Sequence, residues 1–270
     1  MKTPSSCPDC TTPLRSASNT CDECGWNRSA NSRSIAQTLS TLPTFLRMNG
    51  GDMWMGSPRS EKGRDPDETL HHRVVEPFWI ANIEVTQQLY YDVMQTNPST
   101  HKHPLKPVET LTWFEALSFC NALSTFCGRE PVYAALHTDI PTYNPIRNGF
   151  RLPTESEWEW MAKHHRQHIP PHQDQIDWTT QPTDHRNANL QWVLGNVWEF
   201  CWDNYTPYQT DDDSIPSYIP HNAKVVRGGS WVDQQDIFRP ANRAYVDPQN
   251  KTDTIGFRLV LSFSPNTIDL

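Results

Sequence analysis

The sequence predicts a mixed α/β fold that is rich in loops, preceded by a small metal-binding module. Across most of its 270 residues, short apolar runs alternate with glycine and proline, and only a few stretches have helical periodicity. The content of 23 Pro and 11 Trp, with a mean hydropathy of -0.70, indicates a globular core built around aromatic side chains. We expect a zinc ribbon at residues 1–29, a linker at 30–41 and one large domain at 42–270.

The N-terminal module contains two CxxC pairs separated by a ten-residue loop. Four thiolates in this arrangement suit tetrahedral zinc, because each pair chelates from one tight turn while the loop lets the two pairs converge. Iron in a rubredoxin-like site uses the same ligands and is the alternative. We expect the ribbon to dock a protein partner, and the predicted zinc ligands are Cys7, Cys10, Cys21 and Cys24.

The charge of the chain limits its partners. A net charge of -8 and a pI of about 5.7 disfavour general attraction to nucleic acid or to an anionic membrane. The N-terminus does not resemble a signal peptide and no run of 18 apolar residues occurs, so we expect a cytoplasmic protein. The other cysteines, Cys120, Cys127 and Cys201, are scattered, which predicts small buried side chains and no disulfide framework.

In the large domain, apolar runs at residues 45–48 and 78–80 end at turns and predict strands. Helices are predicted over 87–95 and 113–126, with Thr86 and Thr112 as N-caps. A third helix should follow Thr154, which can form a capping box with Glu157 and direct Trp158 and Met161 inward. The polar stretch 164–186 predicts a long surface loop.

Several motifs follow one another in a characteristic order. The main ones are Gly149-Phe-Arg-Leu-Pro-Thr-Glu-Ser-Glu-Trp-Glu159, Gly195-Asn-Val-Trp-Glu-Phe200, Val226-Arg-Gly-Gly-Ser-Trp231 and Ile255-Gly-Phe-Arg-Leu259. Earlier ones are Gly51-Asp-Met-Trp-Met-Gly-Ser57, Glu84-Val-Thr86 and Pro107-Val-Glu109. Together they resemble the formylglycine-generating enzyme (sulfatase-modifying factor) family over residues 45–262. The resemblance implies a bacterial protein with that family's irregular, C-type-lectin-like fold.

The turn at residues 195–199 has the features of a calcium site. It presents main-chain carbonyls beside a carboxylate, and calcium prefers such hard oxygen ligands. The resemblance implies one site with carbonyl ligands from Leu194, Gly195 and Val197 and the carboxylate of Glu199. The structural alternative is that Glu199 is the buried partner of Arg258 or Arg227. The loop of the family's other calcium site is missing after Asn189-Leu190.

The cysteines of the enzymatic members are missing. Those enzymes hold copper(I) between two cysteines, three and eight residues after the serine of the Gly-Gly-Ser motif, and here the positions are Asp233 and Phe238. Neither side chain replaces a thiolate as a copper(I) ligand, so formylglycine-generating oxidase activity is not expected. We assign no metal to the histidines of the chain, including His101, His103, and the pair His164 and His168.

The functional prediction is therefore a non-catalytic module that binds a protein or a small ligand on the surface between Arg227 and Arg243. The alternatives are a diverged metal-dependent oxidoreductase of the same family and a retroelement-diversified binding protein with its variable positions within 232–254. The fold is common to all three and cannot separate them. The candidate contact residues are Ser230, Trp231, Asp233, Asn242, Arg243 and Tyr245.

Overall fold

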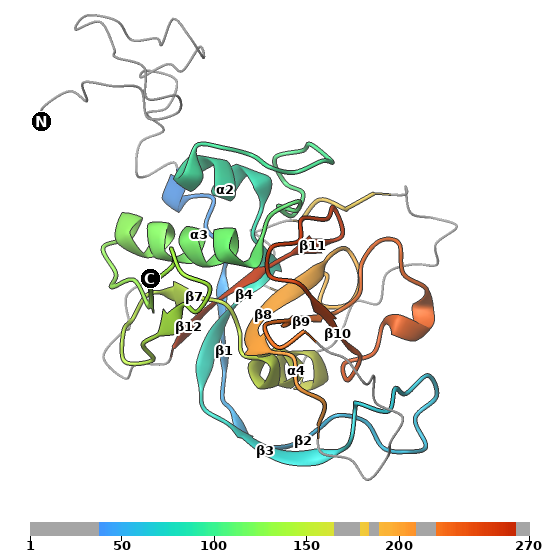
Figure 1. Cartoon of the computed structure of the whole chain (residues 1–270). Helices are drawn as coiled ribbons and strands as arrows, with labels where there is room; N and C mark the ends of the chain where they lie inside the picture. Colours follow the sequence, from blue (N-terminus) through green and yellow to red (C-terminus); the bar gives the residue numbers. More distant parts are fainter. Residues whose placement is uncertain (1–37, 165–178, 184–188, 209–219, 263–270) are drawn as a thin grey trace, which may run out of the picture. The chain divides into compact units, whose positions relative to one another are not determined.

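The computed structural model describes residues 38–164, 179–183, 189–208 and 220–262 (Figure 1). The chain divides into two compact units, Met1–Thr41 and Leu42–Leu270. All the strands and helices named below belong to the second unit. The four cysteines of the predicted zinc ribbon, and most of the predicted linker and of the loop at 164–186, lie outside the described residues.

The first sheet has four antiparallel strands in the order β1 (Phe45–Met48), β4 (Phe78–Glu84), β12 (Arg258–Ser262) and β7 (Phe150–Arg151). Strand β4 is central, and six of its seven residues are buried, so both of its faces lie in the interior. The predicted strands at 45–48 and 78–80 are confirmed as β1 and the first part of β4.

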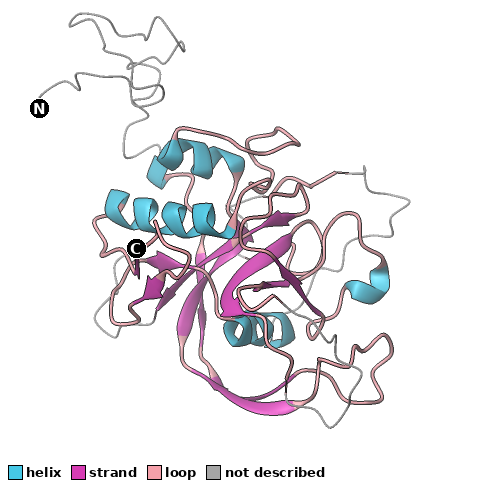
Figure 2. Ribbon diagram, in the orientation of Figure 1, coloured by secondary structure: helices cyan, strands magenta, loops and turns pink. Residues whose placement is uncertain are grey.

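The second sheet has the order β10 (Arg243–Val246), β9 (Lys224–Arg227), β8 (Trp198–Asn204) and β11 (Ile255–Gly256). Strand β11 is parallel to β8, whereas the other pairs are antiparallel. Two short hairpins complete the strands: β2 (Gly51–Met55) pairs with β3 (His71–Val75), and β5 (Tyr133–Ala134) pairs with β6 (Thr142–Tyr143) (Figure 2). The motif at 255–259 joins the two sheets, because it contains β11 and the start of β12.

The three predicted helices are confirmed as α2 (Gln87–Met94), α3 (Trp113–Phe126) and α4 (Glu155–His164). Thr86 caps α2, and Thr112 forms a capping box with Glu115 on α3. The predicted box on α4 is also present: the Thr154 hydroxyl accepts from the Glu157 amide at 3.2 Å, and the Glu157 carboxylate accepts from the Thr154 amide at 2.8 Å. A short 3-10 helix, η2 (Gln235–Ile237), follows β9. None of the helices described is long and apolar enough to cross a membrane.

Two tryptophans form the centres of the core. Trp113 on α3 and Trp158 on α4 are almost completely buried, as is Met161. Each indole N–H has a partner: Trp113 donates to the Cys201 carbonyl at 2.9 Å, and Trp158 donates to Glu199 at 2.8 Å. Large aromatic side chains with a satisfied polar atom stabilise an interior that has few long helices. Helix α4 packs against β2, β3 and β8, and α3 packs against α2 and β7 (Figure 1).

Candidate functional site

Two buried ion pairs join the sequence motifs. Arg258 on β12 and Glu199 on β8 are fully buried and lie 2.6 Å apart. Arg227 on β9 pairs with Glu159 on α4, and both side chains are fully buried. Loss of one partner from a buried pair of this kind leaves an uncompensated buried charge and is strongly destabilising. The two pairs therefore join β12 to β8 and β9 to α4. Arg227, which was expected at one end of a binding surface, is therefore part of the interior.

Glu199 is the buried ion-pair partner of Arg258, which is the structural alternative to a calcium ligand. Both of its carboxylate oxygens accept from Arg258 Nε at 3.1 Å, and one also accepts from Trp158. The backbone of the predicted calcium loop is a tight turn, with positive φ at Gly195 (85°) and Asn196 (64°). A calcium ion bound by Glu199 would have to share these oxygens with a guanidinium group. A calcium site formed by Leu194, Gly195, Val197 and Glu199 therefore stays a prediction.

The two positions that correspond to the copper cysteines have structural contacts. One oxygen of Asp233 accepts from the Ser230 amide at 2.8 Å, the Ser230 hydroxyl at 2.7 Å and the Trp198 indole at 2.9 Å. The Phe238 ring lies against Gly229, where a Cβ atom would be only 2.9 Å from a ring carbon. Gly229 also has a φ of 78°, so the glycine is required by both space and backbone conformation.

The other cysteines do not supply a replacement pair among the residues described. Cys120 on α3 and Cys201 on β8 are completely buried, as expected for small core side chains, and Cys127 is half-buried at the end of α3. Burial raises the pKa of all three thiols above the usual value, which disfavours the thiolate form. Copper(I) coordination by cysteine needs the thiolate.

A group of polar and aromatic side chains, here called the Trp231 cluster, lies beside the Gly-Gly-Ser turn. It consists of two contact groups carried by neighbouring stretches of the chain: His101, Trp231 and Asp253 form one, and Trp198 with Asp233 forms the other. The Trp231 indole donates to the Asp253 carbonyl at 3.2 Å, and His101 Nε2 lies 3.0 Å from the Asp253 carboxylate. The His101 and Trp231 rings meet edge to face, 5.3 Å apart. All five residues are partly exposed, so the cluster offers an imidazole, two indoles and two carboxylates at the surface.

Loops that are far apart in the sequence position this cluster. The carboxylate of buried Glu109 accepts from the amides of Thr100, at 2.9 Å, and His101, at 2.7 Å. Thr110 has a φ of 61°, and its amide donates to the Thr252 carbonyl at 3.0 Å. These bonds hold the loop that carries His101 next to the loop that carries Asp253. This pair could not be predicted from a local sequence pattern, because 152 positions separate the two residues.

The six predicted contact residues do not share one surface. Trp231 and Asp233 belong to the Trp231 cluster, and Tyr245 is 40% exposed on β10. In contrast, Ser230, Asn242 and Arg243 are buried. Arg243 makes two 2.8 Å hydrogen bonds to Glu155 and lies over the rings of Tyr205 and Tyr208. These partners fully surround the guanidinium, which explains why this arginine stabilises the interior and is not presented to a ligand.

The fold and the Gly-Gly-Ser turn define a loop-rich α/β domain of the sulfatase-modifying-factor type that has no cysteine pair beside its turn. The family model described as "Sulfatase-modifying factor enzyme 1-like domain" matches residues 31–263, and the chain belongs to this family. The predicted family and the predicted fold class are thereby confirmed.

Three similar proteins show the range of the family. "Chaperone protein LppX" of Paenibacillus barcinonensis is 27% identical, over 77% of this chain and 87% of the relative. "Hercynine oxygenase" of Mycobacterium tuberculosis is 29% identical, over 45% of this chain and 37% of the enzyme. The solved structure of "Treponema denticola variable protein 1" is 25% identical with a TM-score of 0.67, and the match covers 82% of this chain and 95% of that protein. The chain thus spans a little over a third of the length of the oxygenase.

Proposed function

We propose that this protein is a non-catalytic binding member of the family and that the Trp231 cluster contacts its ligand. The main support for the proposal is that Asp233 and Phe238, at the positions of the copper cysteines, make contacts that stabilise the fold. Asp233 caps the Ser230 turn and binds Trp198, while Phe238 packs on Gly229. Neither side chain can supply the soft ligand that copper(I) requires in the formylglycine-generating reaction.

The composition of the Trp231 cluster supports a binding role. The side chains of His101 and Asp253 are 23% and 37% exposed, so a ligand can reach part of each side chain. Partly exposed indoles provide large, rigid contact areas, and they occur often in binding sites. The Glu109 bonds to the loop that carries His101 limit the conformational entropy that binding would cost. The cytoplasmic location and a protein partner for the N-terminal zinc ribbon belong to the same proposal.

The first test is a direct assay of oxidase activity. The full chain is incubated with copper(I), oxygen and a peptide containing Cys-X-Pro-X-Arg, and mass spectrometry follows loss of the thiol and formation of the aldehyde. We expect no turnover above a control without protein. Copper-dependent aldehyde formation by the unaltered chain would overturn the proposal and favour the alternative of a diverged oxidoreductase.

The binding role is tested with a matched pair of tryptophan variants. Thermal-shift screening of peptide and monosaccharide collections identifies compounds that stabilise the full chain. Trp231→Ala should abolish these shifts, whereas Trp54→Ala, which removes a 62% exposed indole on β2, should keep them. If both variants lose the thermal shifts equally, or if neither variant loses them, the Trp231 cluster is not the contact site.

A second candidate function, diversification of the binding surface by a retroelement, is favoured by two observations. The chain resembles "Treponema denticola variable protein 1" over 82% of its length. The segment 232–254 also exposes several side chains that could vary without loss of the core, such as Val232 (44% exposed) and Tyr245 (40% exposed). Genomic sequencing should then reveal a near-identical template repeat and a reverse-transcriptase gene beside the coding sequence. If both are absent, this candidate is wrong.

A further inference from the structure

The hydrogen-bond donors of the Trp231 cluster are already used within the protein. The Trp231 indole donates to the Asp253 carbonyl at 3.2 Å, and the Trp198 indole donates to Asp233 at 2.9 Å. His101 Nε2 lies 3.0 Å from the Asp253 carboxylate, which can only accept, so this nitrogen carries the proton of the neutral imidazole. A ligand therefore meets acceptors on these side chains and has to supply the donors itself.

Two acceptor atoms of the cluster remain open. Asp253 uses Oδ2 for His101, and its Oδ1 makes no hydrogen bond within the described part of the chain. The Nδ1 atom of His101 likewise has no partner among the residues that the structure describes. Both side chains are partly exposed. An incoming donor can therefore bind Asp253 Oδ1 without displacing a contact of the fold.

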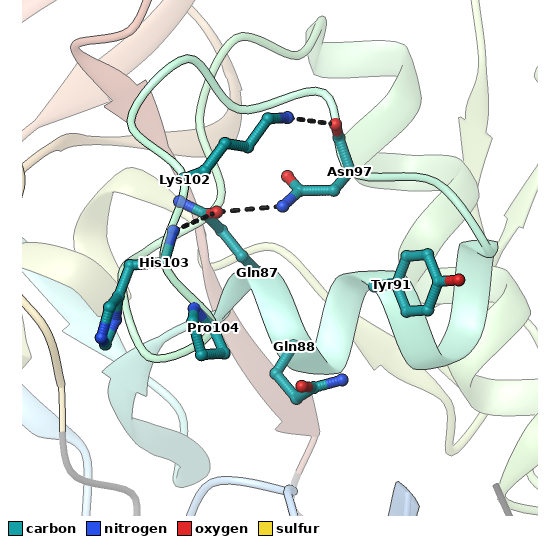
Figure 3. A pocket seen from close by; sticks show the side chains of 7 residues that line it. All are labelled: Gln87, Gln88, Tyr91, Asn97, Lys102, His103 and Pro104. Atoms are coloured by element: carbon teal, nitrogen blue, oxygen red, sulfur yellow. Dashed lines mark hydrogen bonds between the residues drawn. The ribbon is translucent and has the colours of Figure 1, made fainter.

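The charge of Asp253 is not neutralised by a lysine or an arginine. Among the described residues, its only ion-pair partner is His101. Two lysines close to this pair in sequence contact other groups: Lys102 donates to the Asn97 carbonyl at 2.6 Å, as Figure 3 shows, and Lys251 pairs with a glutamate of α3. The chain as a whole has a net charge of -8, which favours the approach of cations. A cation is therefore the best complement to this carboxylate.

The Trp231 ring lies beside the same carboxylate. Its N–H donates to the backbone of Asp253, and the ring meets the His101 ring edge to face at 5.3 Å. Each of the three residues thus contacts the other two, so one ligand can reach all of them. The electron-rich face of an indole attracts a cation, and it also packs against alkyl groups.

The open oxygen of Asp253 favours an ammonium over a guanidinium. A guanidinium binds a carboxylate best through two parallel N–H groups, one to each oxygen. Here His101 occupies Oδ2, so a single oxygen is open. An ammonium is a compact point charge and needs only one such acceptor.

We propose that the ligand of the Trp231 cluster carries an alkylammonium group. The ammonium donates to Asp253 Oδ1, and its carbon chain lies against the Trp231 ring. This assignment rests on the proposed function, because it names the chemical class that the Trp231 cluster takes. The group belongs either to a free amine or to a lysine side chain of a protein partner.

The test uses NMR spectroscopy of the full, 15N-labelled chain at neutral pH and constant ionic strength. n-Butylammonium chloride is titrated to about 10 mM, a range that detects millimolar affinity, alongside the uncharged 1-butanol. A capped Gly-Lys-Gly peptide and its Nε-acetylated form are the second arm. We expect the ammonium compounds, but not their uncharged counterparts, to shift the Trp231 indole resonance and the amide resonances of residues 252–254. A response to n-butylammonium indicates a free amine, and a response to the lysine peptide alone indicates a lysine side chain.

Variants identify the carboxylate that makes the contact. Asp253→Asn keeps an acceptor for His101 and removes the charge, and it should weaken n-butylammonium binding about tenfold. Asp253→Glu restores the charge and should bind more tightly than Asp253→Asn. Asp139→Asn removes an exposed carboxylate outside the Trp231 cluster and should leave the affinity unchanged.

The proposal is wrong if neither ammonium compound shifts these resonances, or if the uncharged compounds shift them equally. It is also wrong if Asp253→Asn binds n-butylammonium as well as Asp139→Asn does, or if n-propylguanidinium binds as tightly as n-butylammonium. Failure of the ligand class is distinguishable from failure of the proposed function. The Trp231 cluster remains the contact site if Trp231→Ala still abolishes the thermal shifts found by screening.

Discussion

The buried carboxyl group of Glu84 should make the stability of the fold depend on pH in an unusual direction. Glu84 ends β4 and is completely buried. One oxygen accepts from Asn196 at 3.1 Å, and the other has no hydrogen-bond partner within the described part of the chain. Burial, with repulsion from Glu199, raises the pKa of Glu84 to about 8, and nearby Arg258 opposes the shift only in part.

The size of this pH effect follows from the difference between the pKa of Glu84 in the folded and in the unfolded chain. In the unfolded chain a glutamate has a pKa of 4.5, so between pH 4.5 and about 8 the folded state holds a proton that the unfolded state releases. The contribution of Glu84 is therefore fully present below the unfolded pKa and is lost as the pH rises through the folded pKa. The slope is about 1.4 kcal/mol per pH unit, which gives a loss of roughly 3 kcal/mol from pH 5 to pH 7.

The substitution Glu84→Gln isolates this effect, because glutamine keeps the acceptor for Asn196 and cannot ionise. The measurement is urea unfolding of both proteins, followed by tryptophan fluorescence, at several pH values. Other buried groups also titrate in this range; burial raises the pKa of Asp203 to about 6, for example. Their contributions are the same in both proteins and cancel when the free energies of unfolding are subtracted. We expect the variant to gain about 3 kcal/mol relative to the unaltered protein between pH 5 and pH 7.

Exposed Glu130→Gln is the matched control and should show no such trend. A difference between Glu84→Gln and the unaltered protein that stays constant with pH would refute the reasoning. It would show that Glu84 is already ionised in the folded state at pH 5.

Two predictions concern metal ions. The full chain prepared without chelator should contain one tightly bound zinc. The substitution Cys21→Ser should remove the zinc without changing the unfolding of the large domain. Elemental analysis that finds neither zinc nor iron would contradict the site. Calcium should raise the melting temperature by an amount that grows with its concentration, and Glu199→Gln should abolish that response. Because this substitution also breaks the pair with Arg258 and costs roughly 3 kcal/mol, the calcium-induced shift must be compared within each variant. A full calcium response in Glu199→Gln would remove Glu199 from the site.

The features that were predicted best from the sequence are those that depend on residues close together along the chain. The capping box of Thr154 and Glu157 was predictable because its two residues are three positions apart, and the same applies to the start of α2 at Thr86. The family motifs indicated the fold class through resemblance. Local patterns of this kind determine most of the secondary structure that positions the site.

The side-chain partners were harder to predict because they come together only in the folded chain. Arg243 was expected at the surface, but Glu155, 88 positions away, pairs with it in the interior. His101 and Asp253 each lie in polar loops without a recognisable motif. The Glu109 carboxylate, which accepts from the His101 amide, and the Thr110 amide, which donates to the Thr252 carbonyl, hold those loops together. A polar residue in a motif can therefore indicate either a ligand contact or a buried partner, and the sequence alone does not separate the two.

Asp233 shows why loss of the metal ligand and retention of the fold are compatible. The Gly-Gly-Ser turn requires a partner for the amide and the hydroxyl of fully buried Ser230, and Asp233 accepts from both while also binding Trp198. A cysteine at this position would be a weak acceptor, and leaving such buried donors unsatisfied costs about 1–3 kcal/mol each. In this chain the side chain at position 233 stabilises the turn and fixes an indole of the Trp231 cluster. The residue that occupies the position of a copper cysteine in the enzymes that the chain resembles thus also helps to form the surface that we propose binds the ligand.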